Sequence, residues 1–228
     1  MLPPRDSLPM IPITLTAGWA DRAMIIDPKN APTADCYKLM VGSIVPRPIA
    51  LVSTTSPNGV RNLAPFSYFT AVASKPATLC FCPGRRGPGG ERKDTLENIE
   101  ATREFVVNVV TVDIAEQMNE TATSFPPEID EFEAAGLTPV PSDIVSPARV
   151  GESPINMECS VLDIINIGDP RDGGGALVLG EIVRFHVADA LYKDGRIDID
   201  ALNPLGRLAG ADYTTLGKKI SIRVKPYP

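Results

Sequence analysis

The sequence VGSIVPRPIALVSTTSPNGVRNLAPFSY, residues 41–68, decides the fold of this chain. Residues 49–54 have the apolar and β-branched composition of a strand, and they end in hydroxyl side chains. Residues 57–59 are Pro-Asn-Gly, and asparagine and glycine adopt the positive φ of a tight turn at low cost. Residues 60–63 can return as a second strand, followed by an irregular exit at residues 64–68. The stretch therefore predicts a β-hairpin.

Polar side chains gather near the ends of this predicted hairpin. Two paired strands hold such groups close together, and a cluster of them suits a polar ligand better than a hydrophobic core. The clustered side chains are Arg47, Ser53, Thr54, Asn62 and Ser67.

Apolar and β-branched runs along the rest of the chain predict more strands than helices. The helices fall between strands rather than alternating with each one, so the pattern favours a mainly β fold with peripheral helices, a closed or nearly closed antiparallel barrel. We expect one domain over residues 31–228, after an N-terminal arm of residues 1–30 that contains Trp19. Predicted strands cover residues 69–72, 77–82, 104–110, 155–167, 176–187 and 219–224; predicted helices cover residues 95–101 and 112–121, and a loop excursion with short helical turns covers residues 124–154.

The predicted strand at residues 176–187 divides its side chains between two faces, because strand side chains alternate. One face carries Leu177, Leu179, Val183, Phe185 and Val187, and the other carries Val178, Ile182, Arg184 and His186.

Composition and charge exclude several classes of protein. The formal net charge of −6 argues against general binding of nucleic acid or an anionic membrane. The four cysteines lack the spacing of a disulfide framework, and with a single histidine the chain is short of zinc ligands, so we predict no metal site. The N-terminus lacks the basic region of a signal peptide, and no apolar run reaches membrane-spanning length. These features predict a soluble cytoplasmic protein.

Residues 84–93 concentrate cations in this acidic chain and run directly into a predicted helix. A helix N-terminus binds phosphate because its dipole and its free N–H groups both point at the anion. The alternative is a solvated loop with an ordinary helix cap, and the polar cluster of the hairpin favours the phosphate site. Neither GxxxxGK[ST] nor GxGxxG is present, so we expect a mononucleotide. The cations are Arg85, Arg86, Arg92 and Lys93, and the cradle would be completed by Thr95 and by a hydroxyl of Ser53, Thr54 or Ser67.

Four runs of this sequence resemble the signature of the flavin reductase-like FMN-binding split-barrel family. They are PRPIALVST at residues 46–54, NLAPFSYF at 62–69, KDTLENI at 93–99 and GEIVRFHVAD at 180–189. The resemblance extends from about Cys36 to the C-terminus. It implies a split β-barrel of the Greek-key antiparallel type that binds FMN along the first strand and residues 62–67. It also implies a homodimer that reduces flavin with NADH or NADPH and often supplies a partner oxygenase.

The flavin ring needs flat apolar surroundings and backbone groups along its pyrimidine edge. Residues 48–50 and 63–65 offer small apolar surface with free backbone groups, and the amide of Asn62 can donate and accept at once. Asn62 could equally hydrogen-bond its own backbone. A cation such as Arg47 near N1 would stabilise reduced flavin. The predicted cofactor-binding residues are Arg47, Pro48, Ile49, Ala50, Ser53, Thr54, Asn62, Leu63, Ala64, Ser67, Lys93, Asp94 and Thr95.

Hydride transfer from a nicotinamide to flavin depends on orientation more than on acid–base groups, so we predict no catalytic side chain. His186 either protonates the flavin or contacts the nicotinamide, or it is an ordinary strand histidine at a surface or subunit interface. Arg207 and Tyr213 lie in a loop that resembles a family segment near the flavin, although such residues also serve as interface anchors. Two alternatives to the reductase stay open: a non-enzymatic FMN electron carrier of the flavoredoxin type, and a barrel without flavin.

Overall fold

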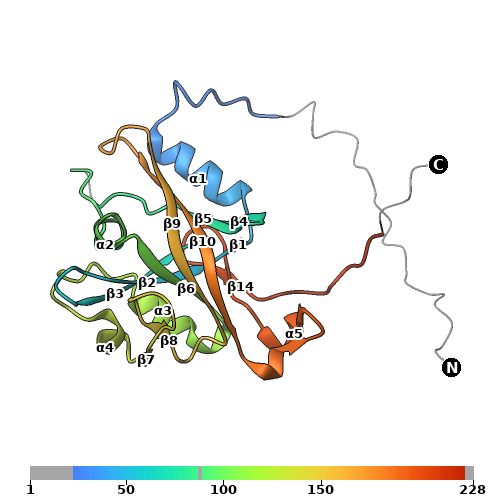
Figure 1. Cartoon of the computed structure of the whole chain (residues 1–228). Coiled ribbons are helices and arrows are strands. Elements are labelled where there is room, and N and C mark those ends of the chain that lie inside the picture. The colour runs from blue at the N-terminus through green and yellow to red at the C-terminus, as the bar shows by residue number, and fades with distance from the viewer. Residues whose placement is uncertain (1–22, 87–88, 224–228) are drawn as a thin grey trace.

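Seven antiparallel strands form the main sheet of the structure, a computed structural model that describes residues 23–86 and 89–223 (Figure 1). They are β2 (Ala50–Thr55), β3 (Arg61–Phe66), β4 (Phe69–Ser74), β5 (Ala77–Phe81), β6 (Glu104–Val109), β9 (Ile155–Ile167) and β10 (Gly175–Val187). Their order in the sheet is β3-β2-β6-β9-β10-β5-β4. Most of the predicted N-terminal arm, including Trp19, lies outside the described residues.

The predicted hairpin is the pair formed by β2 and β3. Its turn contains Gly59 with φ of +85°, the conformation for which glycine is suited. The return strand continues to Phe66, so the prediction of an irregular exit at residues 64–68 is wrong for residues 64–66. These residues belong to the strand because they complete the ladder opposite residues 50–52.

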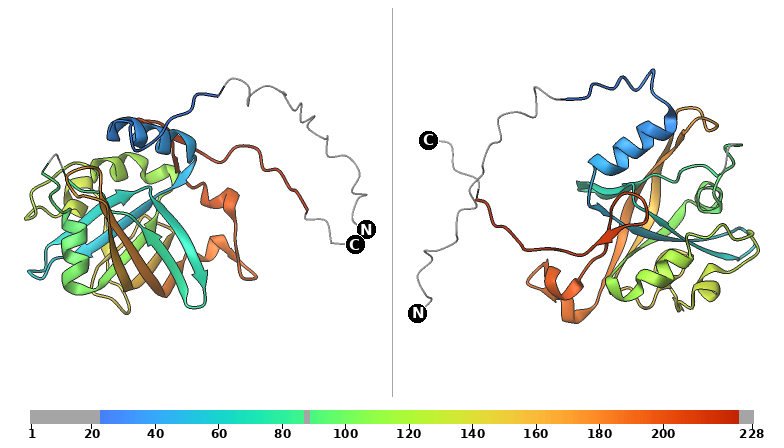
Figure 2. Two further views of the ribbon diagram at one scale, coloured as in Figure 1. Left: turned by 90° about the horizontal axis from the view of Figure 1, so that it is seen from above. Right: turned by 180° about the vertical axis from the view of Figure 1, so that it is seen from behind.

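The two edge strands, β3 and β4, are joined by Ser67 and Tyr68 alone. Two residues cannot bridge a flat sheet of seven strands, in which neighbouring strands lie about 4.8 Å apart. The sheet therefore curls until its edges approach each other, as the view from above shows (Figure 2). The ring centroids of Phe66 on β3 and Phe81 on β5 are 5.1 Å apart as a result. The curl confirms the predicted antiparallel barrel.

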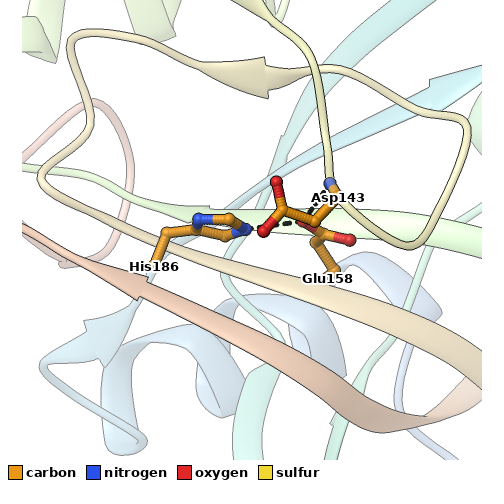
Figure 3. A group of neighbouring side chains, drawn as sticks. All are labelled: Asp143, Glu158 and His186. Carbon is orange, nitrogen blue, oxygen red and sulfur yellow. Dashed lines mark hydrogen bonds and ion pairs between the residues drawn. The ribbon is translucent and has the colours of Figure 1, made fainter.

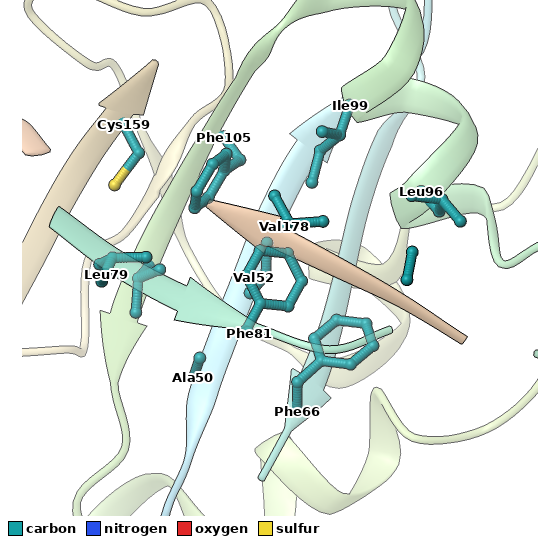
Figure 4. Packing of buried hydrophobic residues seen from close by; sticks show 12 residues of the cluster. Ala50, Val52, Phe66, Leu79, Phe81, Leu96, Ile99, Phe105, Cys159 and Val178 are labelled. Atoms are coloured by element: carbon teal, nitrogen blue, oxygen red, sulfur yellow. The ribbon is translucent and has the colours of Figure 1, made fainter. Parts of the chain in front are cut away.

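A hydrophobic cluster fills the inside of this barrel (Figure 4). At its centre, the ring of Phe81 lies 5.3 Å from the ring of Phe105 on β6. Helix α2 (Asp94–Thr102), where the sequence predicts a helix over residues 95–101, adds Leu96 and Ile99. The buried members are Ala50, Val52, Phe66, Leu79, Phe81, Leu96, Ile99, Phe105, Val107, Cys159, Ala176 and Val178.

A second cluster covers the opposite face of β2 and β3, where α3 (Ala115–Glu120) and α4 (Glu131–Ala135) pack. Strand β2 contributes to both clusters, because Leu51 faces the second while its neighbours face the first. Burial on both faces explains the uninterrupted apolar run of β2. The buried members of this cluster are Ile49, Leu51, Leu63, Val110, Ile114, Met118, Phe132, Leu137, Val150 and Leu205.

A β-bulge interrupts the long ladder of β9 and β10 between Ile182 and Arg184. Before the bulge, Ile182 packs against the barrel core. After it, His186 bonds Glu158, whose strand neighbour Cys159 belongs to that core, so His186 lies on the outer face. An extra residue reverses the alternation of side chains along a strand. The sequence prediction that placed Val178, Ile182, Arg184 and His186 on one face is therefore wrong.

Helix α1 (Thr33–Ser43) precedes the barrel, and the sequence analysis predicted no helix there. Only Val41 of this helix is buried. The predicted helix at residues 112–121 forms as the 3-10 turn η2 (Val112–Ile114) followed by α3. The excursion at residues 124–154 contains α4 and the small hairpin of β7 (Pro139–Val140) and β8 (Arg149–Val150).

The C-terminal part consists of short elements. They are η3 (Asp189–Leu191), β11 (Tyr192–Lys193), β12 (Arg196–Ile197), α5 (Ile199–Leu202), β13 (Gly206–Arg207) and β14 (Tyr213–Thr214); the last two form a small sheet with β1 (Arg47–Pro48). The strand predicted at residues 219–224 does not form over residues 219–223, because no described strand pairs with them; residue 224 lies outside the described residues. Within the described residues, no helix is long and apolar enough to cross a membrane.

Candidate functional site

Three of the predicted site residues, from three elements, meet in one buried hydrogen-bond network. The Oδ1 atom of Asn62 on β3 accepts a bond from Thr95 Oγ1 on α2 at 2.8 Å and another from Thr54 Oγ1 on β2 at 3.1 Å. Asn98 on α2 in turn donates to Thr54 Oγ1 at 3.0 Å. All four side chains are buried. The network therefore fastens the start of α2 to the hairpin, as the phosphate hypothesis requires.

Glu131, the first residue of α4, completes this network, and the sequence analysis did not single it out. Its Oε2 accepts a bond from Asn62 Nδ2 at 2.5 Å and a bond from the backbone N–H of Leu63. Burial raises the pKa of Glu131 to about 7, because desolvation outweighs the bond from Leu63. Glu131 follows Asp130, which caps α4 by accepting the N–H of Phe132, but nothing in that acidic segment distinguishes one carboxylate from the next.

Lys93 and Asp94 lie at the N-terminus of α2, and no side-chain hydrogen bond caps this helix. The Nζ atom of Lys93 lies 5.4 Å from the centroid of the Phe66 ring. Burial lowers the pKa of Lys93, the nearby Arg86 lowers it further, and Glu131 and Asp94 act in the opposite direction. Asp94 is ion-paired with Arg86. The helix start thus holds both an ammonium group and a set of uncapped N–H groups, which is the donor set for a phosphate.

The other predicted cations of the loop are engaged elsewhere in the chain. Arg85 donates to the side chain of Asn166 at 3.0 Å, and Arg92 is ion-paired with Glu100. Of the four cations predicted to hold the phosphate, Lys93 and its neighbour Arg86 therefore remain at the start of α2.

Arg47 and Ser67 lie in a different place, beside α1 and the loop after β13. The buried guanidinium of Arg47 donates to the carbonyl oxygens of Val41 at 2.7 Å and Leu208 at 2.9 Å, and to Ser67 Oγ at 3.3 Å. It therefore ties three segments together. Both residues line a hollow of about 200 Å³, and its other lining residues include Tyr37, Pro65, Tyr68, Arg207 and Tyr213.

Arg207 on β13 and Tyr213 on β14, which both line this hollow, interact with each other. The guanidinium carbon of Arg207 lies 4.4 Å from the centroid of the Tyr213 ring, and the two side chains are hydrogen-bonded. Asn62, Asp94 and Glu131, by contrast, line a separate hollow of about 510 Å³. The strand β3, with Pro65 at one hollow and Asn62 at the other, connects the two places.

The structure separates Ser53 from the other predicted hydroxyls. Its Oγ donates to the carbonyl oxygen of Ala148 at 2.5 Å and accepts from Asn108, on the opposite side of β2 from Thr54. The reason is the strand alternation between neighbouring residues, which the prediction did not apply to this pair. Of the three hydroxyls considered for the phosphate, Thr54 is the one that shares a hydrogen-bond partner with Thr95.

The predicted apolar residues contribute to the core more than to an open surface. Ile49 and Leu63 belong to the second cluster, Ala50 belongs to the barrel core, and Ala64 packs against that core. Pro48 is exposed and pairs with Gly206. A flavin would therefore meet these residues mainly through the free backbone edge of β3, because β2 is paired with β3 and β6 on its two sides.

His186 belongs to a separate cluster with Glu158 and Asp143 (Figure 3). Its Nε2 lies 2.6 Å from Glu158 Oε1, and Glu158 also accepts the backbone N–H groups of Asp143, Ile144 and Val145 at 2.7–3.1 Å. Desolvation acts to raise the pKa of Glu158, but these bonds outweigh it and lower the pKa to about 2. The cluster anchors the loop at residues 143–145, and His186 takes no part in the Asn62 network.

Comparison with known proteins gives one family and several solved structures. Residues 41–200 match the model of the flavin reductase like domain. The structure is similar to nitrilotriacetate monooxygenase component B from Bacillus cereus, with a TM-score of 0.83 and 41% sequence identity over 88% of this chain and 100% of that one. It is also similar to the 2-nitrobenzoate 2-nitroreductase NbaA of Pseudomonas fluorescens, with a TM-score of 0.78 and 31% identity over 89% and 96% of the two chains.

A third structure identifies the architecture. A protein of Shewanella frigidimarina with a split barrel domain aligns with a TM-score of 0.75 and 24% identity, over 89% of this chain and 100% of that one. The curled antiparallel sheet described above is thus a split barrel, as the family resemblance of the sequence implies.

Proposed function

Because this chain belongs to the flavin reductase-like family, we propose that it binds FMN and transfers a hydride to it from NADH or NADPH. The observation that carries this proposal is the contact between the uncapped start of α2 and the edge strand β3 through Asn62 and Thr95. Phosphate is bound well by an ammonium group, a hydroxyl and helix N–H groups that converge. These groups are offered here by Lys93, Thr95 and the first turn of α2.

The remaining predicted contacts fit a flavin ring that lies along β3 on the side away from α2. Beyond Asn62, the edge of β3 that no strand of the main sheet covers presents the carbonyl oxygens of Leu63 and Pro65, while the N–H of Leu63 is bonded to Glu131 and proline has no N–H. Backbone acceptors of this kind would receive the N–H group of a flavin's pyrimidine edge. At the far end, Arg47 holds the hydroxyl of Ser67 in position.

The bound flavin would supply hydride acceptance at its ring, and the chain would supply orientation. Thr54 and Asn98 hold the amide of Asn62 in one orientation, and burial of the network excludes water from it. Fixed geometry of this kind lowers the entropic cost of bringing donor and acceptor together. No step of this scheme needs an acid or base, so the scheme assigns no catalytic side chain.

We further propose that the chain acts as a homodimer and that it supplies reduced flavin to an oxygenase. Support for the dimer comes from Tyr37 and Met40 on one face of α1 and from Ile44 directly after the helix, which are 57%, 48% and 63% exposed. Tyr68 and Val72 add exposed apolar surface from the edge strand β4 and the residue before it. Support for the oxygenase comes from the 41% identity to a monooxygenase component B.

Two measurements test this function. The purified chain is titrated with FMN, FAD and riboflavin while flavin fluorescence is followed, and we expect the tightest binding for FMN. NADH or NADPH is then added with free flavin in excess, and absorbance at 340 nm is followed. Rapid oxidation of the nicotinamide supports the reductase. Tight FMN binding without nicotinamide oxidation would instead support the electron carrier, and failure to bind any flavin would contradict the proposal.

A further inference from the structure

Glu131 places a buried negative charge where the proposed flavin phosphate would lie. Its side chain bonds Asn62 and the N–H of Leu63, and through Asn62 it is one residue away from Thr95 at the start of α2. Glu131 is only 4% exposed. A phosphate dianion brought to the same helix start would be repelled by an ionised carboxylate in surroundings of low dielectric constant.

We propose that Glu131 is a positioning residue that takes up one proton when a phosphorylated flavin binds, so that affinity for FMN, but not for riboflavin, falls as the pH rises. This inference rests on the proposed flavin-binding function and adds to it a proton-coupled control of the phosphate end of the site. The proton comes from solvent and is held on a carboxylate oxygen of Glu131 while the phosphate is bound.

The charged groups around Glu131 do not cancel its charge in the presence of a dianion. Lys93 and Arg86 are positive and lie on the segment before α2, but Arg86 is already paired with Asp94. Asp130, on α4 itself, is paired with Arg61 of β3. One ammonium group, that of Lys93, is therefore shared between Glu131 and the incoming phosphate. The charged groups that face Glu131 are Lys93, Arg86, Asp94 and Asp130, with Arg61 and Glu133 beyond Asp130.

The hydrogen bonds give Glu131 a second influence on the site. An ionised carboxylate only accepts, so the amide group of Asn62 must turn its NH₂ toward Glu131 and its Oδ1 toward Thr54 and Thr95. The hydroxyl of Thr95 then points its proton at Asn62. A protonated carboxyl group can donate, which lets the amide of Asn62 turn over. The Thr95 hydroxyl is then free to donate to a phosphate oxygen.

The ligand-free protein already favours proton uptake near neutral pH. Burial raises the pKa of Glu131 to about 7, and a bound dianion would raise it further. The second ionisation of a phosphate monoester has a pKa of about 6, so above pH 7 the charge of FMN itself changes little. The window from pH 7 to pH 9 therefore keeps the charge of FMN nearly constant, and Glu131→Gln separates the proton of Glu131 from that of Lys93, whose pKa burial lowers.

The test compares FMN and riboflavin binding to the full chain at pH 7, 8 and 9 by flavin fluorescence. For FMN we expect the dissociation constant to rise by up to roughly tenfold per pH unit, the limit for one coupled proton. Riboflavin lacks the phosphate, and its binding should stay flat. Glu131→Gln should abolish the slope and bind FMN more tightly than the unaltered chain at pH 9. Glu133→Gln, on the exposed face of the same helix, serves as the matched control and should keep the slope.

Calorimetry on the unaltered chain covers the case in which Glu131→Gln does not fold. FMN is titrated at pH 8 in two buffers of different ionisation enthalpy, and we expect uptake of close to one proton with FMN and none with riboflavin. FMN binding without proton uptake, or an unchanged slope in Glu131→Gln, would overturn the inference and leave the flavin function standing. Failure to bind either flavin at any pH would overturn both.

Discussion

The pKa values of two buried glutamates of this chain shift in opposite directions. Glu158 and Glu131 are 0% and 4% exposed, so both carry the cost of desolvation. Glu158 receives three backbone N–H groups and His186, and its pKa falls to about 2; Glu131 receives one backbone N–H and one amide, and its pKa rises to about 7. Desolvation dominates at Glu131, whereas the additional donors outweigh it at Glu158 and favour the ionised carboxylate.

Glu158 should make the fold sensitive to acid. Its folded pKa lies below the value of 4.5 for an ordinary glutamate, so folding favours the ionised form. The stabilisation is complete above about pH 4.5 and disappears as the pH falls toward 2. Glu158→Gln should lower the free energy of unfolding at pH 7 by about 1–3 kcal/mol, measured by urea denaturation. The exposed Glu116→Gln is the control, and equal losses in the two variants would contradict this role.

Substitution of Lys93 tests where the phosphate of the ligand binds. Lys93→Ala removes a charge-assisted contact to the phosphate, so FMN affinity should fall by about 1.5–3 kcal/mol, measured by fluorescence titration. Riboflavin affinity should change much less. Lys193→Ala, in the exposed hairpin of β11 and β12, should leave both unchanged. An unaltered FMN affinity in Lys93→Ala would show that the phosphate lies elsewhere.

At the scale of elements, the barrel depends on a close approach between β10 and β6. A Cβ atom at Gly180 would lie 2.4 Å from Cζ of Phe105, a buried ring of the barrel core. Glycine at this position is what allows the ring to lie against the strand. The contact explains a glycine inside a long strand, where its flexibility would otherwise be a cost.

Gly180→Ala should therefore be destabilising. The added methyl group forces the Phe105 ring or the strand to move, and overpacking of this kind costs about 1–3 kcal/mol in free energy of unfolding. Gly217→Ala is the matched control, because no atom lies within 4 Å of a Cβ there. Thermal or urea unfolding of both variants gives the comparison, and a Gly180→Ala protein as stable as Gly217→Ala would refute the packing argument.

Elements that depend on local chemistry could be predicted from the sequence, and those that depend on distant partners could not. The hairpin of β2 and β3 and the helix α2 follow from turn residues, β-branched runs and apolar spacing. Helix α1 buries only Val41, so it shows little of the core-facing pattern that signals a helix. Residues 219–223 have strand composition but no described strand to pair with.

At the scale of the whole molecule, the proposed dimer should depend on the exposed face of α1. Met40→Glu places a charge in the centre of that face, so it should shift the chain from dimer to monomer in sedimentation velocity measurements at micromolar concentration. Ile199→Glu on α5 changes an equally exposed apolar residue and should leave the dimer intact. A monomeric unaltered chain, or a dimer that persists in Met40→Glu, would contradict this assignment of the interface.

The sequence by itself determined the strands of the main sheet, the start of α2 and three members of the buried network, Thr54, Asn62 and Thr95, because turn chemistry, side-chain period and helix-start signals act over a few residues. Only the tertiary structure decided that Ser53 faces away from them, that a bulge turns His186 outward, and that Glu131 completes the network. Glu131 lies 69 positions from Asn62 along the chain. Contacts of that range depend on how the sheet curls and where a separate helix packs, and no local pattern of residues encodes either one.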